Sequence, residues 1–126
     1  MVPPRIVVGN VTIDKGRFEV WVGEERIELT FVEFELLYAL ARNAGRVVPR
    51  SRLKLDVWNE HTKGDDRKLT VHFSRLRKKL RTGGSVLQIE TVKKRGYMLT
   101  LGTEREEASL ATQARLVPAR YERSDL

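Results

Sequence analysis

The residues from Asp65 to Arg81 carry the strongest chemical signal in this sequence. Seven of these seventeen residues are Lys or Arg, and the only two carboxylates, Asp65 and Asp66, stand at the start of the segment. Ammonium and guanidinium groups offer positive charge and hydrogen-bond donors, which suits the binding of phosphates better than the cleavage of a bond. The segment therefore indicates a binding site for a polyanion.

The spacing of the apolar residues predicts a helix over residues 66–81. At about 100° per residue, Leu69, Phe73, Leu76 and Leu80 fall on one side and form a stripe that should be buried. The opposite side is polar and basic. It carries Arg67, Val71, Ser74, Arg75 and Lys78, flanked by Lys68, His72 and Lys79 on one side and Thr70 and Arg77 on the other. Asp65 and Asp66 are expected to cap the helix, because carboxylates suit the exposed N–H groups of a helix N-terminus.

A basic face often serves only to keep a surface helix in solution. Here the cations are not interleaved with Glu, so they repel one another instead of pairing. The face also carries Val71, an apolar residue of the kind that contacts a thymine methyl group in the major groove. Both features favour a nucleic-acid-binding face over a merely solvated one.

The charge of the whole chain is concentrated in the same region. Residues 65–101 hold ten Lys or Arg against three Asp or Glu, whereas residues 1–64 and 102–126 are nearly balanced. A patch of one sign indicates a polyanionic partner, most commonly nucleic acid. An anionic membrane surface attracts such patches too, but the apolar side of this helix is needed for a core.

Composition excludes several other classes of protein. The 126 residues suffice for one folded domain, and the chain has no cysteine for disulfides or thiolate metal sites. It has no apolar run that could span a membrane and no signal peptide, so we expect a cytoplasmic protein without a cofactor. His61 and His72 could be combined with Asp65 and Asp66 as a nuclease metal site, but helix capping explains the aspartates more simply. An enzyme is therefore not expected.

The flanking segments predict an α+β domain. Alternating apolar residues over 5–29 predict about four antiparallel strands, with Phe18, Val20 and Val22 on one face and Trp21 at the rim. Thr30 and Glu33 form a capping box for a helix that should end at Gly45. A second helix is expected over residues 50–58, with Pro49 in its first turn and Leu53 and Val57 pointing inward.

A β-hairpin follows the basic helix. Residues 86–91 and 97–101 alternate like strands, and the turn between them carries Lys93, Lys94 and Arg95. Three adjacent cations repel one another, so this tip is better explained as a phosphate or groove contact than as a folding element. Residues 102–126 change to an acidic, Ala-rich composition, which predicts a weakly helical or disordered tail beyond a domain of residues 1–101.

Several motifs together resemble the OmpR/PhoB-type DNA-binding domain, a winged helix–turn–helix that forms the output domain of bacterial two-component response regulators. The first motifs are Leu29-Thr30-x-x-Glu33-Phe34-x-Leu36-Leu37, Gly45-Arg46-Val47-Val48 and Val57-Trp58. The others are Val71-His72-x-Ser74-Arg75-Leu76-Arg77-Lys78-Lys79-Leu80 and Thr91-Val92-x-x-x-Gly96-Tyr97. The resemblance covers about residues 5–101.

The resemblance implies a role for each matching residue. The basic helix would read the major groove, with Arg75 contacting a base and Val71 a thymine methyl group, and Lys93 would reach the minor groove. The positions that match phosphate contacts are Arg50, Trp58, Arg67, His72, Arg77, Thr91 and Tyr97. The remaining basic or polar residues expected at the DNA are Lys68, Ser74, Lys78, Lys94 and Arg95. The loop 59–64 matches one that contacts RNA polymerase.

The sequence also departs from the family pattern. Lys93 stands where arginine is common, Thr70 replaces a usual aspartate, and Pro49 takes a position that is often a capping residue. No receiver domain precedes the sheet, so either an output domain has been cut out or the regulator lacks phosphorylation control. Without a receiver, we expect a monomer that pairs on direct-repeat half-sites only when DNA is bound. An RNA-binding or protein-binding winged helix, and the first domain of a longer activator, remain the alternatives.

Overall fold

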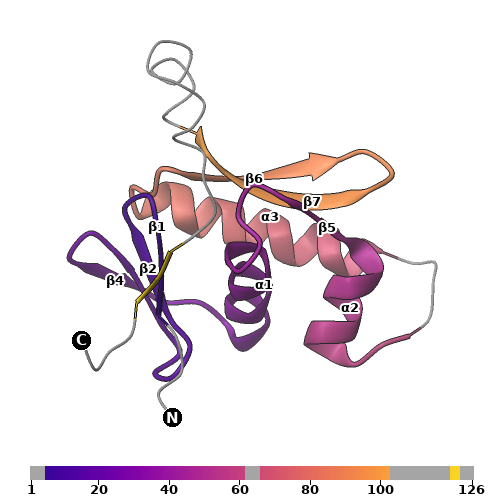
Figure 1. The fold of residues 1–126 in the computed structure, drawn as a ribbon, viewed down its shortest axis with the longest axis horizontal. Coiled ribbons are helices and arrows are strands. Elements are labelled where there is room, and N and C mark those ends of the chain that lie inside the picture. The colour runs from indigo at the N-terminus through magenta and orange to yellow at the C-terminus, as the bar shows by residue number, and fades with distance from the viewer. Residues whose placement is uncertain (1–4, 62–65, 103–119, 123–126) are drawn as a thin grey trace.

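An antiparallel sheet forms the N-terminal part of the fold. The computed structural model describes residues 5–61, 66–102 and, for the backbone alone, 120–122. β1 (Arg5–Val8), β2 (Val11–Asp14), β3 (Glu19–Val22) and β4 (Glu25–Ile27) lie in the order of the sequence. Alternate residues of β1, β2 and β3 are buried, as the period of two requires. The predicted four-stranded antiparallel sheet is confirmed (Figure 1).

Two details of the sheet differ from the sequence prediction. Phe18 does not share the face of Val20 and Val22, because it lies in the turn before β3 with a φ of 54° and is exposed. Its ring packs instead on Phe34, with the centroids 4.7 Å apart. The backbone of residues 120–122 forms β8 (Arg120–Glu122), which pairs with β1 and places Tyr121 opposite Ile6. Residues 103–119 and 123–126 of the tail predicted as weakly helical or disordered lie outside the described residues.

The first helix, α1 (Phe31–Ala41), lies at the centre of the core. Thr30 and Glu33 exchange the two hydrogen bonds of a capping box, as predicted, with Thr30 Oγ1 accepting from the Glu33 N–H at 3.1 Å. The helix ends at Ala41 and not at Gly45. The amide of Asn43 donates to the Ala39 carbonyl at 2.9 Å, so a side chain satisfies part of the last turn. Gly45, at a φ of 83°, belongs to the turn that follows.

A second sheet joins the hairpin to the helices. β6 (Leu87–Val92) and β7 (Gly96–Leu101) form the predicted hairpin, and β5 (Val47–Pro49) pairs with β7 on its other side. The sequence did not predict β5, because its three residues gain their hydrogen bonds only from a strand far along the chain. Pro49 is the N-cap residue of α2 (Arg50–Trp58), one position before the predicted first turn.

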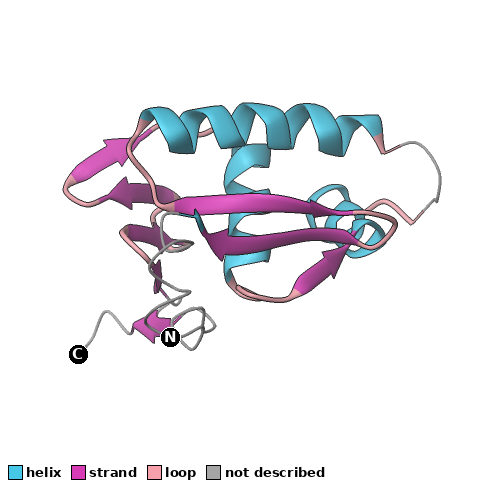
Figure 2. Ribbon diagram, turned by 90° about the horizontal axis from the view of Figure 1, so that it is seen from above, coloured by secondary structure: helices cyan, strands magenta, loops and turns pink. Residues whose placement is uncertain are grey.

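The basic helix is α3 (Arg67–Thr82), and its predicted buried stripe of Leu69, Phe73, Leu76 and Leu80 is confirmed. The N-cap position is held by Asp66, but its side chain makes no capping hydrogen bond, which corrects the expected cap; Asp65 is outside the described residues. Figures 1 and 2 show α3 running beside the β6–β7 hairpin, with α1 crossing beneath it. The described residues thus form the predicted α+β winged helix–turn–helix, which places the helix face and the hairpin tip on one molecule.

Candidate nucleic-acid interface

The exposed side of α3 consists of the residues that the sequence predicted for it. Val71 is 45% exposed although it is apolar, and Ser74, Arg75 and Lys78 are exposed beside it. Within the described part of the chain, Ser74, Arg75 and Lys78 make no side-chain hydrogen bond or ion pair. These side chains are therefore available to an external partner, as a binding face requires. We call Val71, Ser74, Arg75 and Lys78 the reading face.

One flank of the reading face is an aromatic and basic cluster built from α2 and α3. The ring of Trp58 lies 5.7 Å from that of His72, and the ammonium group of Lys68 lies 4.7 Å from the Trp58 ring. Lys68 Nζ also donates to a Glu60 carboxylate oxygen at 2.7 Å. Three of the predicted site residues thus come together here, and the contact with Glu60 holds Lys68 in place.

On the other flank, Arg77 connects α3 to the hairpin. Its Nε donates to the carbonyl of Ile89 at 2.8 Å, and its Nη2 donates to the hydroxyl of Thr91, also at 2.8 Å. Two predicted phosphate-binding residues, Arg77 and Thr91, are therefore bonded to each other. Because both Arg77 contacts end on β6, the helix and the hairpin are fixed relative to one another.

The hairpin tip exposes three cations without intramolecular ion pairs in the described residues. Lys93, Lys94 and Arg95 are exposed, and the Arg95 N–H donates to the Val92 carbonyl at 2.9 Å to close the turn. Gly96 follows at a φ of 153°, where a Cβ would collide with the backbone of Val48. Because glycine has no side chain, β7 can approach β5 closely here, immediately behind the basic tip.

Tyr97 and Arg50 lie behind the reading face. Tyr97 is buried, and its ring stacks on Phe73 at 4.1 Å. The guanidinium carbon of Arg50 lies 5.7 Å from the Tyr97 ring, and its Nε is 3.7 Å from a carboxylate oxygen of Asp66. Tyr97 thus supports Arg50 as well as the core. Arg67 is exposed at the first residue of α3, near the same helix end.

Sequence reasoning missed a buried lysine in α2. Lys54 is only 2% exposed, and its Nζ lies 2.9 Å from Oδ1 of Asp66. From the sequence, only Leu53 and Val57 of this helix are expected to point inward. The available signal was helical spacing, since Lys54 lies one position from Leu53 and three from Val57 on the inward side of that helix.

A second buried charge ties α3 to α1. Glu33 is 1% exposed, and Lys79 Nζ donates to its Oε1 at 2.6 Å. Burial alone would raise the pKa of Glu33, but hydrogen bonds from Lys79 and from the Thr30 N–H, with the charge of Lys79, leave that pKa below its ordinary value. The ammonium group of Lys79 thus forms an intramolecular ion pair, although Lys79 lies next to Lys78 in the sequence.

The described residues contain no group of three or more His, Cys, Asp or Glu side chains placed to hold a metal ion. Asp66 instead faces Lys54 and Arg50, and His72 packs on Trp58. Among these same residues, no helix is long and apolar enough to cross a membrane.

Comparison with known proteins gives one consistent match. Residues 23–99 match the family described as "Transcriptional regulatory protein, C terminal". The alkaline phosphatase synthesis transcriptional regulatory protein PhoP of Bacillus subtilis is 40% identical over 96 residues, which are 75% of this chain and 40% of that protein. The heme response regulator HssR of Staphylococcus aureus is 33% identical over 92 residues, 73% of this chain and 41% of its own length. The chain thus spans about two fifths of these relatives.

Solved structures agree with the sequence match. The DNA-binding domain of RstA from Klebsiella pneumoniae, crystallised with the RstA box, superposes with a TM-score of 0.67 at 35% identity, covering 75% of this chain and 94% of that one. The DNA-binding domain of CpxR from Escherichia coli gives a TM-score of 0.68 at 33% identity, covering 77% of this chain and 96% of that one.

Proposed function

Since the chain belongs to the family of C-terminal domains of transcriptional regulatory proteins, we propose that it binds double-stranded DNA at specific sequences and regulates transcription. This family membership agrees with the OmpR/PhoB-type resemblance found in the sequence, and the family is one of DNA-binding regulators and not of enzymes. The observation that carries the proposal is the reading face, whose side chains have no partner among the described residues and lie opposite the buried stripe of α3.

In this proposal α3 enters the major groove. Arg75 has the fork of donors that matches the O6 and N7 acceptors of guanine, and Val71 supplies an apolar surface for a thymine methyl group. Ser74 and Lys78 lie beside them and hold the backbone or neighbouring base edges. The hairpin tip then lies along the adjacent minor groove, where Lys93 is the inserted residue and Lys94 and Arg95 contact phosphates.

The phosphate contacts come from residues that the fold holds in place. Arg50, Trp58, Arg67, Lys68, His72, Arg77, Thr91 and Tyr97 are assigned to the DNA backbone in this proposal. Nδ1 of His72 is buried and has no hydrogen-bond partner, so Nε2 is the ring nitrogen left for a phosphate. The guanidinium of Arg77 uses the N–H of Nε and one N–H of Nη2 on the hairpin, which leaves both N–H groups of Nη1 and the second of Nη2 as donors toward DNA.

RNA binding is less well supported than duplex DNA binding. Readers of single-stranded RNA stack bases on exposed aromatic side chains. Tyr97 is buried against Phe73, and Trp21 lies on the outer face of the N-terminal sheet. Neither of these two side chains therefore lies along the reading face, and Trp58 on its flank already contacts His72 and Lys68.

Contacts beyond DNA form a separate part of the proposal. We assign the loop 59–64 to an interaction with RNA polymerase; residues 62–64 of it are outside the described part. We propose a cytoplasmic protein bound to the nucleoid, monomeric in solution and pairing on direct repeats about one helical turn apart. Light scattering of the chain at micromolar concentration should give the monomer mass, and a stable dimer would contradict this.

Selection of bound sequences from random duplex DNA tests the main proposal. A repeated half-site should emerge, and affinity for it should fall with salt at a log–log slope of about −4 to −7, because about 5–8 phosphates are neutralised. Affinity that is independent of salt, or equal binding to RNA hairpins of any sequence, would contradict DNA recognition.

A further inference from the structure

We propose that Lys54 is a positioning residue for DNA binding: it neutralises Asp66 and thereby leaves Arg50 available to a DNA phosphate. The inference rests on the proposed function, in which Arg50 is a backbone contact. It concerns three charged groups that meet where α2 joins the start of α3.

The buried ammonium group of Lys54 depends on Asp66 for charge compensation. Its side chain is 2% exposed, and burying an ammonium group is unfavourable unless an opposite charge lies close by. Oδ1 of Asp66 lies 2.9 Å away and is itself buried. The contact is an ion pair by distance but is not aligned as a hydrogen bond, so it provides charge compensation and little orientation.

Arg50 contacts the same carboxylate more loosely. Its Nε is 3.7 Å from Oδ2, beyond hydrogen-bond length, and its side chain is 25% exposed. The Tyr97 ring beneath the guanidinium keeps it close to the α3 N-terminus without occupying its donors. Arg50 is thus near an anion but is not committed to it.

Lys54 and Arg50 both contact the single carboxylate of Asp66. Asp66 carries a single negative charge, and the short contact belongs to Lys54. If the Lys54 charge were removed, Asp66 would be left partly buried with Arg50 as its other described ion-pair partner. An arginine and a carboxylate form two parallel hydrogen bonds with good geometry, so Arg50 would turn toward Asp66 and away from DNA.

Salt dependence of DNA binding separates this role from a purely structural one. Arg50→Ala should make the log–log slope less steep by about 0.9, the amount for one phosphate contact. Lys54→Met should reduce the slope by the same amount although Arg50 is intact. Arg50→Ala combined with Lys54→Met should reduce it no further, and Lys54→Met combined with Asp66→Asn should restore it.

The control is Lys15→Met, which removes another ion-paired lysine, bonded to Glu35 at 2.6 Å and outside the proposed interface. It should leave the slope unchanged. Thermal unfolding of every variant reports stability separately, and Lys54→Gln replaces Lys54→Met if the latter does not fold.

Two results would overturn the inference in different ways. If Lys54→Met lowers the unfolding temperature but leaves the slope unchanged, Lys54 is structural only. If Arg50→Ala leaves the slope unchanged, Arg50 does not contact phosphate, which removes that part of the proposed function and the inference with it, while specific binding through the reading face would still stand.

Discussion

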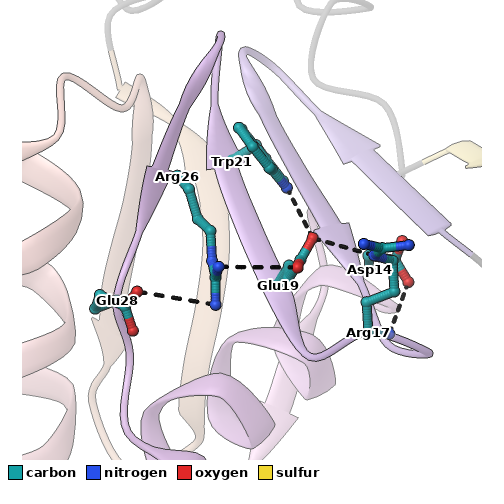
Figure 3. Close-up of polar contacts among 6 residues, drawn as sticks. All are labelled: Asp14, Arg17, Glu19, Trp21, Arg26 and Glu28. Atoms are coloured by element: carbon teal, nitrogen blue, oxygen red, sulfur yellow. Dashed lines mark hydrogen bonds and ion pairs between the residues drawn. The ribbon is translucent and has the colours of Figure 1, made fainter.

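The outer face of the N-terminal sheet and the reading face of α3 are both rich in polar side chains, but only the first has its charges paired. Around Glu19, the indole N–H of Trp21 donates at 3.2 Å, and the guanidinium groups of Arg17 and Arg26 approach at 3.3 and 3.9 Å (Figure 3). Arg26 also contacts Glu28 at 3.8 Å. On the reading face, Arg75 and Lys78 have no such partner within the described residues.

This difference is expected if the first face is scaffold and the second binds DNA, as proposed. The Trp21 hydrogen bond, followed by the nearby arginine charges, lowers the pKa of Glu19, so the carboxylate is kept ionised by its own neighbours. Such a group gains little from an external partner. Unpaired cations that repel one another gain most when a polyanion arrives. Four predictions test the comparison.

Arg75→Ala should have the largest effect on binding. Loss of the fork-like contact with a base should cost about 1–3 kcal/mol and relax the preference at one position of the site. Binding to a panel of single-base variants of the selected site measures both effects. Arg67→Ala is the matched control, which should weaken all sequences alike; an equally uniform loss with Arg75→Ala would mean that the helix register on DNA is wrong.

The adjacent residues Lys78 and Lys79 should behave in opposite ways. Lys78→Ala removes an unpaired cation, so it should make the salt slope less steep by about 0.9 without changing stability. Lys79→Ala leaves the Glu33 carboxylate buried without its ion-pair partner, so it should lower stability by about 1–3 kcal/mol with little change in slope. Salt titrations and chemical denaturation of both variants are the measurement. If both variants changed the slope equally, the distinction between paired and unpaired cations would be wrong.

The Glu33–Lys79 pair also predicts a pH dependence. Because the pKa of Glu33 is lower in the folded chain than its ordinary 4.5, the pair contributes stability above that value. The contribution is lost as pH falls through the lower folded pKa. Glu33→Gln keeps a capping-box side chain but removes the charge, so it should be less stable than the parent near neutral pH and should lose less stability in acid. If the difference in unfolding free energy between Glu33→Gln and the parent were the same at all pH values, this prediction would be refuted.

The smallest effect is expected on the outer sheet face. Glu19→Gln removes the carboxylate charge but keeps an acceptor for the Trp21 N–H, and no DNA contact is proposed there. DNA affinity and its salt slope should therefore match those of the parent chain. A clear change in either would place the N-terminal sheet in the binding surface and contradict the difference between the two faces.

The periodic parts of this fold could be predicted from sequence because their signals are local. The buried stripe of α3 and the alternation of the first strands each follow from neighbouring residues, and so does the capping box at Thr30. What could not be predicted depends on distant residues. β5 exists because β7 pairs with it, and Lys54 is buried because Asp66 lies beside it in space.

The candidate site also has features that follow from local sequence and features that depend on distant residues. The composition of the reading face follows from helical spacing alone, and the exposure of Val71 agrees with it. Tyr97 was assigned to phosphate from its position in a motif, whereas its stacking on Phe73 depends on how the hairpin packs on α3. The division between paired and unpaired cations likewise requires the three-dimensional arrangement.

The bonds from Arg77 to β6 have a consequence for the DNA itself. Since they fix the hairpin to α3, the two elements proposed to bind the major and the minor groove cannot move independently. Such a protein measures length along the duplex. One base pair inserted between the major-groove bases and the minor-groove segment would displace the latter by about 3.4 Å, and the hairpin tip could not follow it. The spacing within each half-site would then be as strictly selected as its bases.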